Sequence, residues 1–298
     1  MRILLFGQNG QLGWELTERL SYIGELYAPA RTSADGAGDL THAQAIAEAI
    51  IRYRPQVVFN AAAYTAVDKA ESEYEMALTV NAFAPAAMAA ACAAVDALLV
   101  HYSTDYIFDG TGNMSRDESS EPMPLNAYGR SKLEGEVAIM GSGCRHLILR
   151  TSWVYGVHGH NFVKTILRLA SQQKSLSVVD DQVGTPTSAA FLAESSMELM
   201  KSVLSGDVPH GVYNVVPDGF VSWCDFARTI VALSVKANFK LGVSDIEPIT
   251  SEQYPTPAKR PLNSRLSNEK LKKTLPIGAI KPWQYYLART LQAMQLCD

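Results

Sequence analysis

A glycine-rich turn directly after an apolar N-terminal segment is the feature that most constrains the fold. Residues 2–6 form an apolar run typical of a buried strand, and the chain continues Gly7-Gln8-Asn9-Gly10-Gln11-Leu12-Gly13. Glycines at this spacing let a strand turn sharply into a helix and let the backbone approach a phosphate, whose charge then lies at the helix N-terminus. We therefore expect a dinucleotide-phosphate site formed by Gly7, Gly10, Gln11, Leu12 and Gly13.

Strand and helix patterns alternate through the first half of the chain. We expect strands at Arg2–Phe6, Glu25–Ala28, Val57–Asn60, Ala97–Ser103 and His146–Thr151. The intervening helices are expected at Gln11–Leu20, His42–Tyr53 with Thr41 as cap, Glu73–Val95 with a kink at Pro85, and Asn126–Met140. This alternation predicts an α/β fold with a Rossmann-type, doubly wound parallel sheet.

The pattern loosens after Ser152. Helices are expected at Phe162–Ser171, Ala189–Leu204, Trp223–Lys236 and Pro282–Gln295, and short strands at Leu176–Val179, Val212–Asn214 and Ile246–Pro248. We therefore expect residues 1–152 to form the dinucleotide-binding domain. Residues 153–298 are expected to form mainly a smaller C-terminal α/β substrate lobe, with some segments returning to the first domain.

The composition argues against several classes of protein. Of the 298 residues, 47% are hydrophobic and 19% charged, and the net charge of −4 gives no general basic field for nucleic acid. The long apolar stretch at residues 82–100 contains Pro85 and Asp96, and a small-residue helix followed by a strand explains it better than a membrane span. We expect neither a nucleic-acid partner nor a membrane partner.

The cysteines are scattered and form no C-x-x-C pair, which argues against both a zinc site and a redox dithiol. They are Cys92, Cys144, Cys224 and Cys297. Free thiols fit a reducing compartment, and the N-terminal apolar run is too short for a signal peptide, so we expect a cytoplasmic protein.

The end of the second expected strand indicates which dinucleotide binds. An acidic residue there would hydrogen-bond the ribose of NAD, whereas an arginine favours a 2′-phosphate. The chain reads Ala28-Pro29-Ala30-Arg31-Thr32, so we expect NADP(H), with NADH as a weaker substitute. The alternative is that Arg31 is a solvated loop residue. Further cofactor contacts are expected from Asp39, Leu40, Ala62, Ala63, Tyr64, Thr65, Tyr102, Tyr128 and Lys132.

A second motif carries acid–base chemistry. Tyr128 and Lys132 are four residues apart on an expected helix and share one face. A phenol is a poor acid–base group at neutral pH unless its anion is stabilised, and an adjacent ammonium does this. The fourth strand ends in His101-Tyr102-Ser103-Thr104, which brings a hydroxyl to the edge of the sheet where ligands bind. We therefore expect Thr104, Tyr128 and Lys132 to be catalytic.

With these motifs the chain resembles the dTDP-4-dehydrorhamnose reductase family of extended short-chain dehydrogenases/reductases. The resemblance spans nearly the whole length, and its most specific phrases begin at Asn60 (NAAAYTAVDKA), His101 (HYSTDY) and Arg150 (RTSWVY). It implies that NADPH delivers hydride to C4 of dTDP-4-dehydro-β-L-rhamnose. It further implies that Tyr128 protonates the C4 oxygen, Thr104 contacts that oxygen or tunes Tyr128, and Lys132 lowers the Tyr128 pKa.

The resemblance implies that Thr104, Asp105, Tyr128 and Trp153 contact the sugar nucleotide. Trp153 follows Thr151 and Ser152 at a strand end, so pocket lining competes there with simple core packing. Two arginines near the C-terminus, Arg260 and Arg265, could pair with the substrate diphosphate. For them, packing between the lobes is an equal alternative.

One departure from the family concerns assembly. Some members are dimers bridged by Mg²⁺ through glutamates. Glu15 is present here, but the other two positions hold Ala190 and Gln292. Because a site poor in carboxylates binds a hard cation badly, we expect no Mg²⁺ and either a monomer or a homodimer.

Two other functions compete with reduction. A nucleotide-sugar 4,6-dehydratase or epimerase shares the fold and the catalytic residues, but a dehydratase of this superfamily has a glutamate where this chain has Tyr106. A non-catalytic NADP-binding regulatory subunit is the alternative from another class. Because Thr104, Tyr128 and Lys132 are all present, we favour catalysis.

Overall fold

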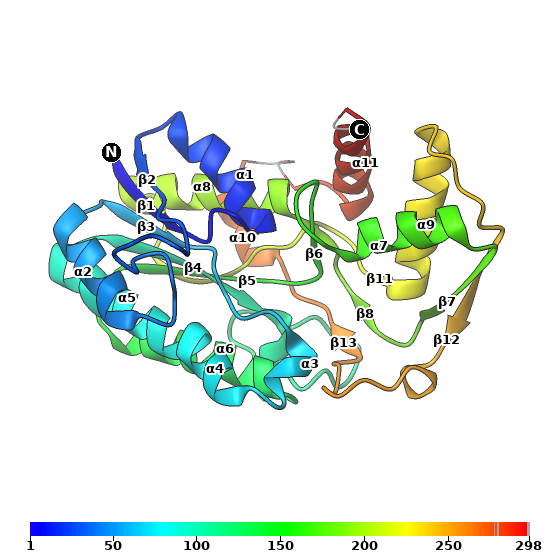
Figure 1. Ribbon diagram of the computed structural model, residues 1–298, viewed down its shortest axis with the longest axis horizontal. Coiled ribbons are helices and arrows are strands. Elements are labelled where there is room, and N and C mark those ends of the chain that lie inside the picture. The colour runs from blue at the N-terminus through cyan, green and yellow to red at the C-terminus, as the bar shows by residue number, and fades with distance from the viewer. Residues whose placement is uncertain (277, 279, 297–298) are drawn as a thin grey trace.

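Six parallel strands form the central sheet in the order β10-β5-β4-β3-β1-β2 (Figure 1). The computed structural model describes residues 1–276, 278 and 280–296. The strands are β1 (Arg2–Phe6), β2 (Glu25–Tyr27), β3 (Val57–Asn60), β4 (Leu98–Thr104), β5 (His146–Thr151) and β10 (Gly211–Asn214). The Rossmann-type parallel sheet predicted from the sequence is confirmed.

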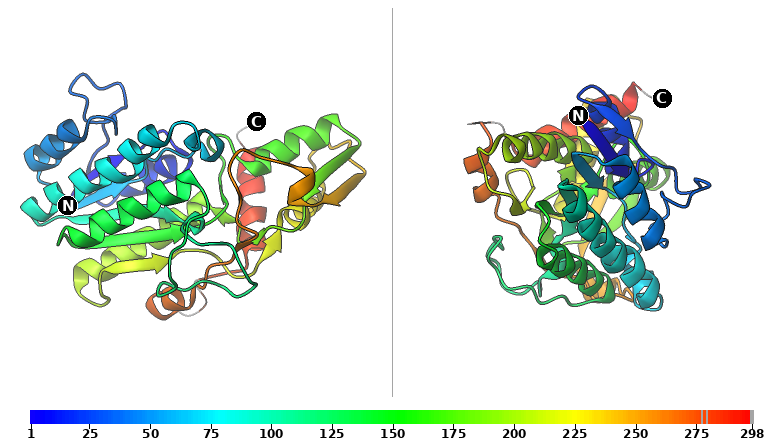
Figure 2. Two further views of the ribbon diagram at one scale, coloured as in Figure 1. Left: turned by 90° about the horizontal axis from the view of Figure 1, so that it is seen from below. Right: turned by 90° about the vertical axis from the view of Figure 1, so that its left-hand side faces the viewer.

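Helices cover both faces of this sheet (Figure 2). One face packs on α1 (Gln11–Ser21) and α8 (Ala189–Ser205), and the other on α2 (Ala43–Tyr53), α5 (Ala84–Val95) and α6 (Ala127–Gly141). Alternate residues of each strand enter opposite cores: Ile3 and Leu5 face one, Leu4 and Phe6 the other. Burial on both faces explains why these strands read as continuous apolar runs.

Several segments from the second half of the chain lie against the first domain. Strand β10 extends the sheet beyond β5, α8 packs against α1, and α10 (Glu269–Thr274) packs on β10. The chain therefore crosses between the two lobes more than once. The division at residue 152 stays a prediction.

The second lobe lies at the right of Figure 1 and surrounds a third apolar cluster. Its helices are α7 (Phe162–Gln172), α9 (Trp223–Lys236) and α11 (Trp283–Gln295). Its strands are the parallel pair β7 (Ser175–Val179) and β12 (Asp245–Ile249), the set β11 (Val221–Ser222), β8 (Val183–Gly184) and β13 (Asn263–Ser264), and the pair β6 (Val154–Tyr155) and β9 (Thr187–Ser188). The two-residue strands were not predicted, because they are too short to show a periodic pattern.

The long helix expected over residues 73–95 is present, but its irregularity precedes the proline. After α3 (Val67–Ala70), the chain forms α4 (Tyr74–Leu78), a π-helical turn (Thr79–Phe83) and α5. Pro85 lies in the first turn of α5 and cannot donate a backbone hydrogen bond to the preceding turn. A wider π turn upstream accommodates that missing bond.

The helical stretch Tyr74–Val95 is long and apolar enough to cross a membrane by length and composition alone, with a mean hydropathy of 1.7. Its composition has another explanation in the fold. Ala84, Met88 and Cys92 are buried against the sheet, so small apolar side chains allow close packing of the helix on the strands.

Two smaller expectations have different outcomes. Thr41 does not cap α2; its backbone N–H and hydroxyl both donate to the Asp39 carboxylate, and His42 takes the N-cap position. Cys92, Cys144 and Cys224 are free and buried, whereas Cys297 lies outside the described residues.

A buried ion pair fastens α6 to the sheet. Arg150 at the end of β5 donates from Nη2 to Oε2 of Glu136 at 2.7 Å and from Nε to both carboxylate oxygens at 3.1 and 3.2 Å. The two side chains are only 4% and 0% exposed. Since α6 carries Tyr128 and Lys132, this pair helps to set the helix that presents the expected catalytic residues.

We expect Arg150→Met to lower the free energy of unfolding by about 3–5 kcal/mol, because Glu136 would remain buried without its partner. Urea denaturation measures this loss. Arg150→Met combined with Glu136→Leu should recover much of it, and the exposed-pair control Lys201→Met should change stability by no more than about 1 kcal/mol. A loss below about 1 kcal/mol in Arg150→Met would contradict the role of the pair.

Candidate active site

The carboxyl ends of β1 and β3 meet where the strand order reverses, with β2 on one side of β1 and β3 on the other. Open α/β sheets bind ligands at this switch point. The glycine turn after β1 and the loop after β3 lie in contact there. A Cβ on Gly7 would lie 2.6 Å from the Ala62 nitrogen.

The glycine turn forms a tight cradle. Gly7 has φ +87°, and its carbonyl accepts from the Gly10 N–H at 3.0 Å. A Cβ on Gly13 would lie 1.9 Å from the Gly7 oxygen, so α1 can start this close to β1 only with glycine at that position. The first-turn N–H groups of α1 follow Gly10, which has no side chain to cap them, and they suit a phosphate.

Within this cradle Gln11 and Leu12 are available through their backbones. The Leu12 side chain is buried in the core beneath the sheet. The Gln11 side chain accepts from Asn161 Nδ2 at 2.9 Å, and Asn161 is the N-cap residue of α7 in the second lobe. The glycine turn is therefore linked directly to that lobe.

Arg31, the residue expected to contact the 2′-phosphate of NADP(H), is exposed and lies beside the carboxylate of Asp39. The Arg31 side chain is 77% exposed, and its Nε lies 3.6 Å from Asp39 Oδ2. A backbone hydrogen bond from Thr41 keeps the pKa of Asp39 below its usual value. The Leu40 side chain is buried in the core, so only its backbone can contact a cofactor.

The loop after β3 is held by an asparagine that the sequence analysis missed. Asn81, in the π-helical turn, accepts from the Tyr64 N–H at 2.9 Å and donates to the Tyr64 carbonyl and to Ser131 Oγ, both at 3.0 Å. It thereby ties the loop of Ala62, Ala63, Tyr64 and Thr65 to helix α6. A polar residue inside a long apolar helix was the available signal.

Thr104 and Tyr128 approach each other across the ends of β4 and α6. The N-cap Asn126 starts α6 by accepting from the Gly129 N–H at 2.8 Å, which places Tyr128 in the first turn. Burial raises the pKa of Tyr128 above its usual value, and a hydrogen bond with Thr104 opposes this rise. The phenol is therefore protonated at neutral pH, as a proton donor must be.

Lys132 lies one turn farther along α6 and is 2% exposed. Its ammonium donates to the Tyr102 carbonyl at 2.7 Å and lies 3.2 Å from His101 Nε2. Burial lowers the pKa of Lys132 to about 8, against an upward effect of Glu136. Tyr102 holds this lysine by its backbone, since its ring is in the core. The effect of Lys132 on the Tyr128 pKa stays a prediction.

Asp105 presents an unpaired oxygen at the same edge. Its Oδ1 accepts from Thr104 Oγ1 at 3.2 Å, whereas its buried Oδ2 has no hydrogen-bond partner among the described residues. Burial raises the pKa of Asp105 to about 6, and Ser264 from β13 counters this effect by a hydrogen bond. Sequence reasoning found Asp105 but missed Ser264, which comes from the other lobe.

Arg260 already has protein partners. It donates from Nη2 to Asp68 Oδ2 at 2.7 Å and from Nη1 to the Tyr106 hydroxyl at 3.1 Å. Arg265 lies elsewhere, on the Phe220 ring and 3.0 Å from Asn263 Oδ1. These contacts favour packing as the main role of both arginines, although Arg260 also lines a cavity.

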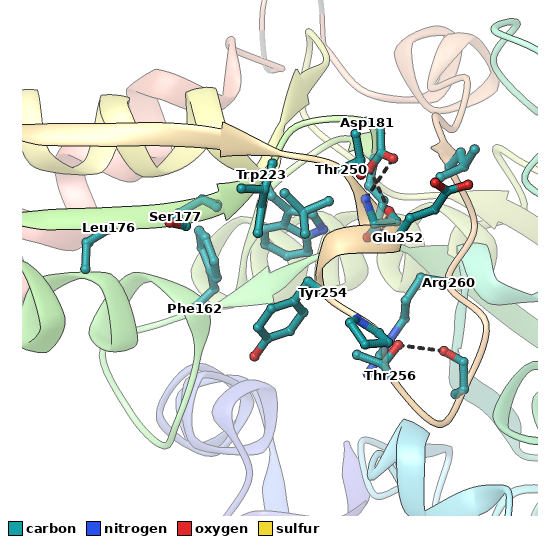
Figure 3. A pocket seen from close by; sticks show the side chains of 18 of the residues that line it. Phe162, Leu176, Ser177, Asp181, Trp223, Thr250, Glu252, Tyr254, Thr256 and Arg260 are labelled. Carbon is teal, nitrogen blue, oxygen red and sulfur yellow. Dashed lines mark hydrogen bonds between the residues drawn. The ribbon is translucent and has the colours of Figure 1, made fainter.

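That cavity has a volume of about 1090 Å³ and lies mainly in the second lobe, reaching Tyr106 in the first. Figure 3 shows the Phe162 and Trp223 rings side by side, with Tyr254 and Arg260 farther along the wall. Trp223 is stacked on Trp153 with ring centroids 3.6 Å apart. Trp153 has a φ of +49°, a left-handed conformation costly for this residue type, which the ring stacking supports.

Glu15 is in an ion pair. It is buried and pairs with Arg19, which also reaches Glu194 on α8 at 3.4 Å. A neighbouring cation satisfies this carboxylate. The expectation that no Mg²⁺ binds here stays a prediction.

Comparisons with known proteins agree with this geometry. The family model of the RmlD substrate binding domain matches residues 1–296. The dTDP-4-dehydrorhamnose reductase of Salmonella typhimurium is 42% identical over 294 residues, covering 99% of this chain and 98% of that protein.

Solved structures agree as well. A dTDP-4-dehydrorhamnose reductase from Clostridium acetobutylicum superposes with a TM-score of 0.89 at 36% identity, covering 99% of this chain and 100% of that chain. The enzyme of Bacillus anthracis, solved in complex with NADP, has a TM-score of 0.86 at 33% identity and covers 97% and 98%.

The glycine cradle gives a sharp test. Gly13→Ala should weaken NADPH binding at least ~100-fold, because its Cβ would overlap the Gly7 carbonyl and push α1 away from the phosphate site. Gly141→Ala is the matched control, since a Cβ at this last residue of α6 would have no neighbouring atom within 4 Å. Fluorescence titration with NADPH measures both. Equal affinities in the two variants would refute the cradle.

Proposed function

Because this chain belongs to the RmlD substrate binding domain family, we propose that it reduces the C4 keto group of dTDP-4-dehydro-β-L-rhamnose with NADPH. The product is dTDP-β-L-rhamnose, a precursor of cell-surface polysaccharides. The observation that carries the proposal is that half-buried Tyr128 lies with buried Thr104 and Lys132 at the carboxyl edge of the sheet, the edge that also carries the glycine cradle.

NADPH, when bound, supplies hydride to C4. The chain supplies the matching proton: Tyr128 donates it to the C4 oxygen, so that hydride and proton together convert the ketone to an alcohol. Thr104 hydrogen-bonds the phenol and would contact the same C4 oxygen. Lys132 provides a positive charge that favours the phenolate left behind. The ammonium donates one hydrogen to the Tyr102 carbonyl, and another would be available to the nicotinamide ribose.

Two features favour a sugar nucleotide as the substrate. The unpaired Oδ2 of Asp105 is an acceptor for a sugar hydroxyl next to the reacting carbon. The cavity beyond Tyr106 and Arg260 offers aromatic rings and a cation, which suit a base and a phosphate. Trp153, which stacks on the cavity residue Trp223, would line the passage between Asp105 and this cavity.

Arg31, which favours NADP(H), weighs against an epimerase that retains NAD, and Tyr106 weighs against dehydration. Burial raises the pKa of its phenol, and its hydroxyl accepts a hydrogen bond from Arg260, so it is a poor base for abstracting a sugar proton. A purely regulatory role would leave the hydrogen-bonded Thr104 and Tyr128 without a task. Reduction uses both, and it needs no base at position 106.

The same proposal extends to the setting of the enzyme. We expect a cytoplasmic enzyme acting on a dTDP-sugar as monomer or homodimer, without nucleic-acid or membrane partners.

Freshly made dTDP-4-dehydrorhamnose should be reduced as NADPH is oxidised, and chromatography should identify dTDP-rhamnose as the product. Tyr128→Phe should lower kcat by ~100- to 10,000-fold while leaving the NADPH Kd within ~3-fold, because only the proton donor is lost. Tyr22→Phe, at an 82% exposed tyrosine, is the control. Full activity in Tyr128→Phe would eliminate this residue as the donor.

Arg31 should determine the cofactor preference. Arg31→Ala should raise the KM for NADPH by ~10- to 100-fold, the loss of one charged contact to a phosphate, with little change for NADH. Steady-state kinetics with both cofactors measures this, and Arg289→Ala on α11 of the second lobe is the control. If the unmodified enzyme uses NADH as well as NADPH, the assignment is wrong.

A further inference from the structure

We propose that His101 is a positioning residue for Lys132: its Nε2 accepts from the ammonium and, with the Tyr102 carbonyl, holds that group toward the cofactor and Tyr128. The inference deepens the proposed reductase function and rests on it. The residues that carry the reaction in the proposed mechanism are Thr104, Tyr128 and Lys132, so His101 would act through the lysine.

The imidazole lies in the middle of a short chain of polar groups inside the sheet. His101 is on β4, directly opposite Asn60 of β3, and both residues are 1% exposed. Its Nε2 lies 3.2 Å from Lys132 Nζ, and its Nδ1 lies 3.0 Å from Asn60 Nδ2. Simple packing would need only an apolar side chain of this size, whereas here both ring nitrogens contact polar groups.

The chemistry of the ring couples these contacts. A neutral imidazole has one N–H and one lone pair. If Lys132 is an ammonium, Nε2 must be the acceptor, so Nδ1 carries the hydrogen and needs an oxygen of Asn60 opposite it. If Asn60 instead presents its NH₂ group, Nε2 carries the hydrogen and the lysine must be a neutral amine. The amide orientation of Asn60 and the charge of Lys132 therefore depend on each other through His101.

Asn60 connects this chain of groups to the cofactor loop. Its Oδ1 accepts from the Ala62 N–H at 3.3 Å, directly after β3. If the Asn60 amide rotates so that its oxygen faces His101, as a charged Lys132 requires, the Ala62 N–H loses this acceptor. That N–H lies in the loop where the dinucleotide is expected to bind. The geometry thus links the loop that contacts the cofactor with the charge of the lysine.

The surroundings make each acceptor on Lys132 important. From α6 it faces Glu136, which is itself neutralised by Arg150 of β5, and Tyr128 lies one turn earlier on the same helix. From β4 it faces His101 and the Tyr102 carbonyl. Burial and the nearby lysine hold the His101 pKa well below its usual value, so the ring is an uncharged acceptor across neutral pH. Losing that acceptor removes support for the charged lysine.

Three variants separate this role from packing. The Oε1 atom of His101→Gln can occupy the place of Nε2 and still accept from Lys132. The shorter His101→Asn can reach Asn60 only, and His101→Leu fills similar volume without any acceptor. The enzyme's kcat with NADPH and dTDP-4-dehydrorhamnose, and the NADPH Kd without sugar, are measured from pH 6 to 10.

In the unmodified enzyme kcat should fall and the NADPH Kd should rise as the pH increases through about 8, where Lys132 loses its proton. The Asn and Leu variants should show this limb at least ~1 pH unit lower, with kcat at pH 8 reduced ~10-fold and the sugar KM within ~2-fold. The Gln variant should stay within ~0.3 units of the unmodified enzyme. If the His101→Leu substitution prevents folding, as judged by circular dichroism, the Asn and Gln pair decides.

Identical pH profiles in the Asn and Gln variants would overturn the inference. If the unmodified enzyme binds NADPH but does not reduce dTDP-4-dehydrorhamnose, the proposed function fails. The NADPH titration then still decides whether His101 supports the charge of Lys132.

Discussion

Lys132 carries an ammonium at the interface between α6 and the central sheet, where burial favours the neutral amine. Several neighbouring groups stabilise the charged form of this lysine. Strand β4 supplies a backbone carbonyl and an imidazole to it, and Glu136 one turn away supplies negative charge. The Glu136 charge is in turn stabilised by Arg150 from β5. The proton transfer that we propose for this site needs both a dry environment and enough acceptors to keep the lysine charged.

The two lobes are fastened next to this site. Asp68 on α3 accepts from Arg260 and from the Ala258 N–H at 3.2 Å, and Asn126 donates to the Lys259 carbonyl at 2.9 Å. The segment around residue 260 therefore bonds to the first domain while lining the cavity of the second. Because Asn126 also caps α6, one residue positions both the start of α6 and the wall of the cavity. Lobe packing and site geometry are thus coupled.

The sequence predicted the parts of this protein that depend on local pattern. Strands buried on both faces, the glycine turn and the pair Tyr128 and Lys132 all follow from spacing along the chain. Thr104 could be brought to them because parallel strands end at a common edge. The contacts of Asn81, His101 and Arg260 could not be predicted, since each joins residues far apart in the sequence through side-chain hydrogen bonds. The two-residue strands and the left-handed Trp153 likewise depend on tertiary packing.

Asp105 shows how such a site differs from the rest of the core. A carboxylate that is 2% exposed, with one oxygen unpaired among the described residues, costs stability that an apolar side chain would not. The hydrogen bonds from Thr104 and Ser264 offset part of this cost. In the proposed reaction a sugar hydroxyl would donate to Oδ2, so substrate binding would gain the interaction that folding leaves incomplete. Because this carboxylate neighbours Thr104, the same contact would orient the keto carbon toward Tyr128.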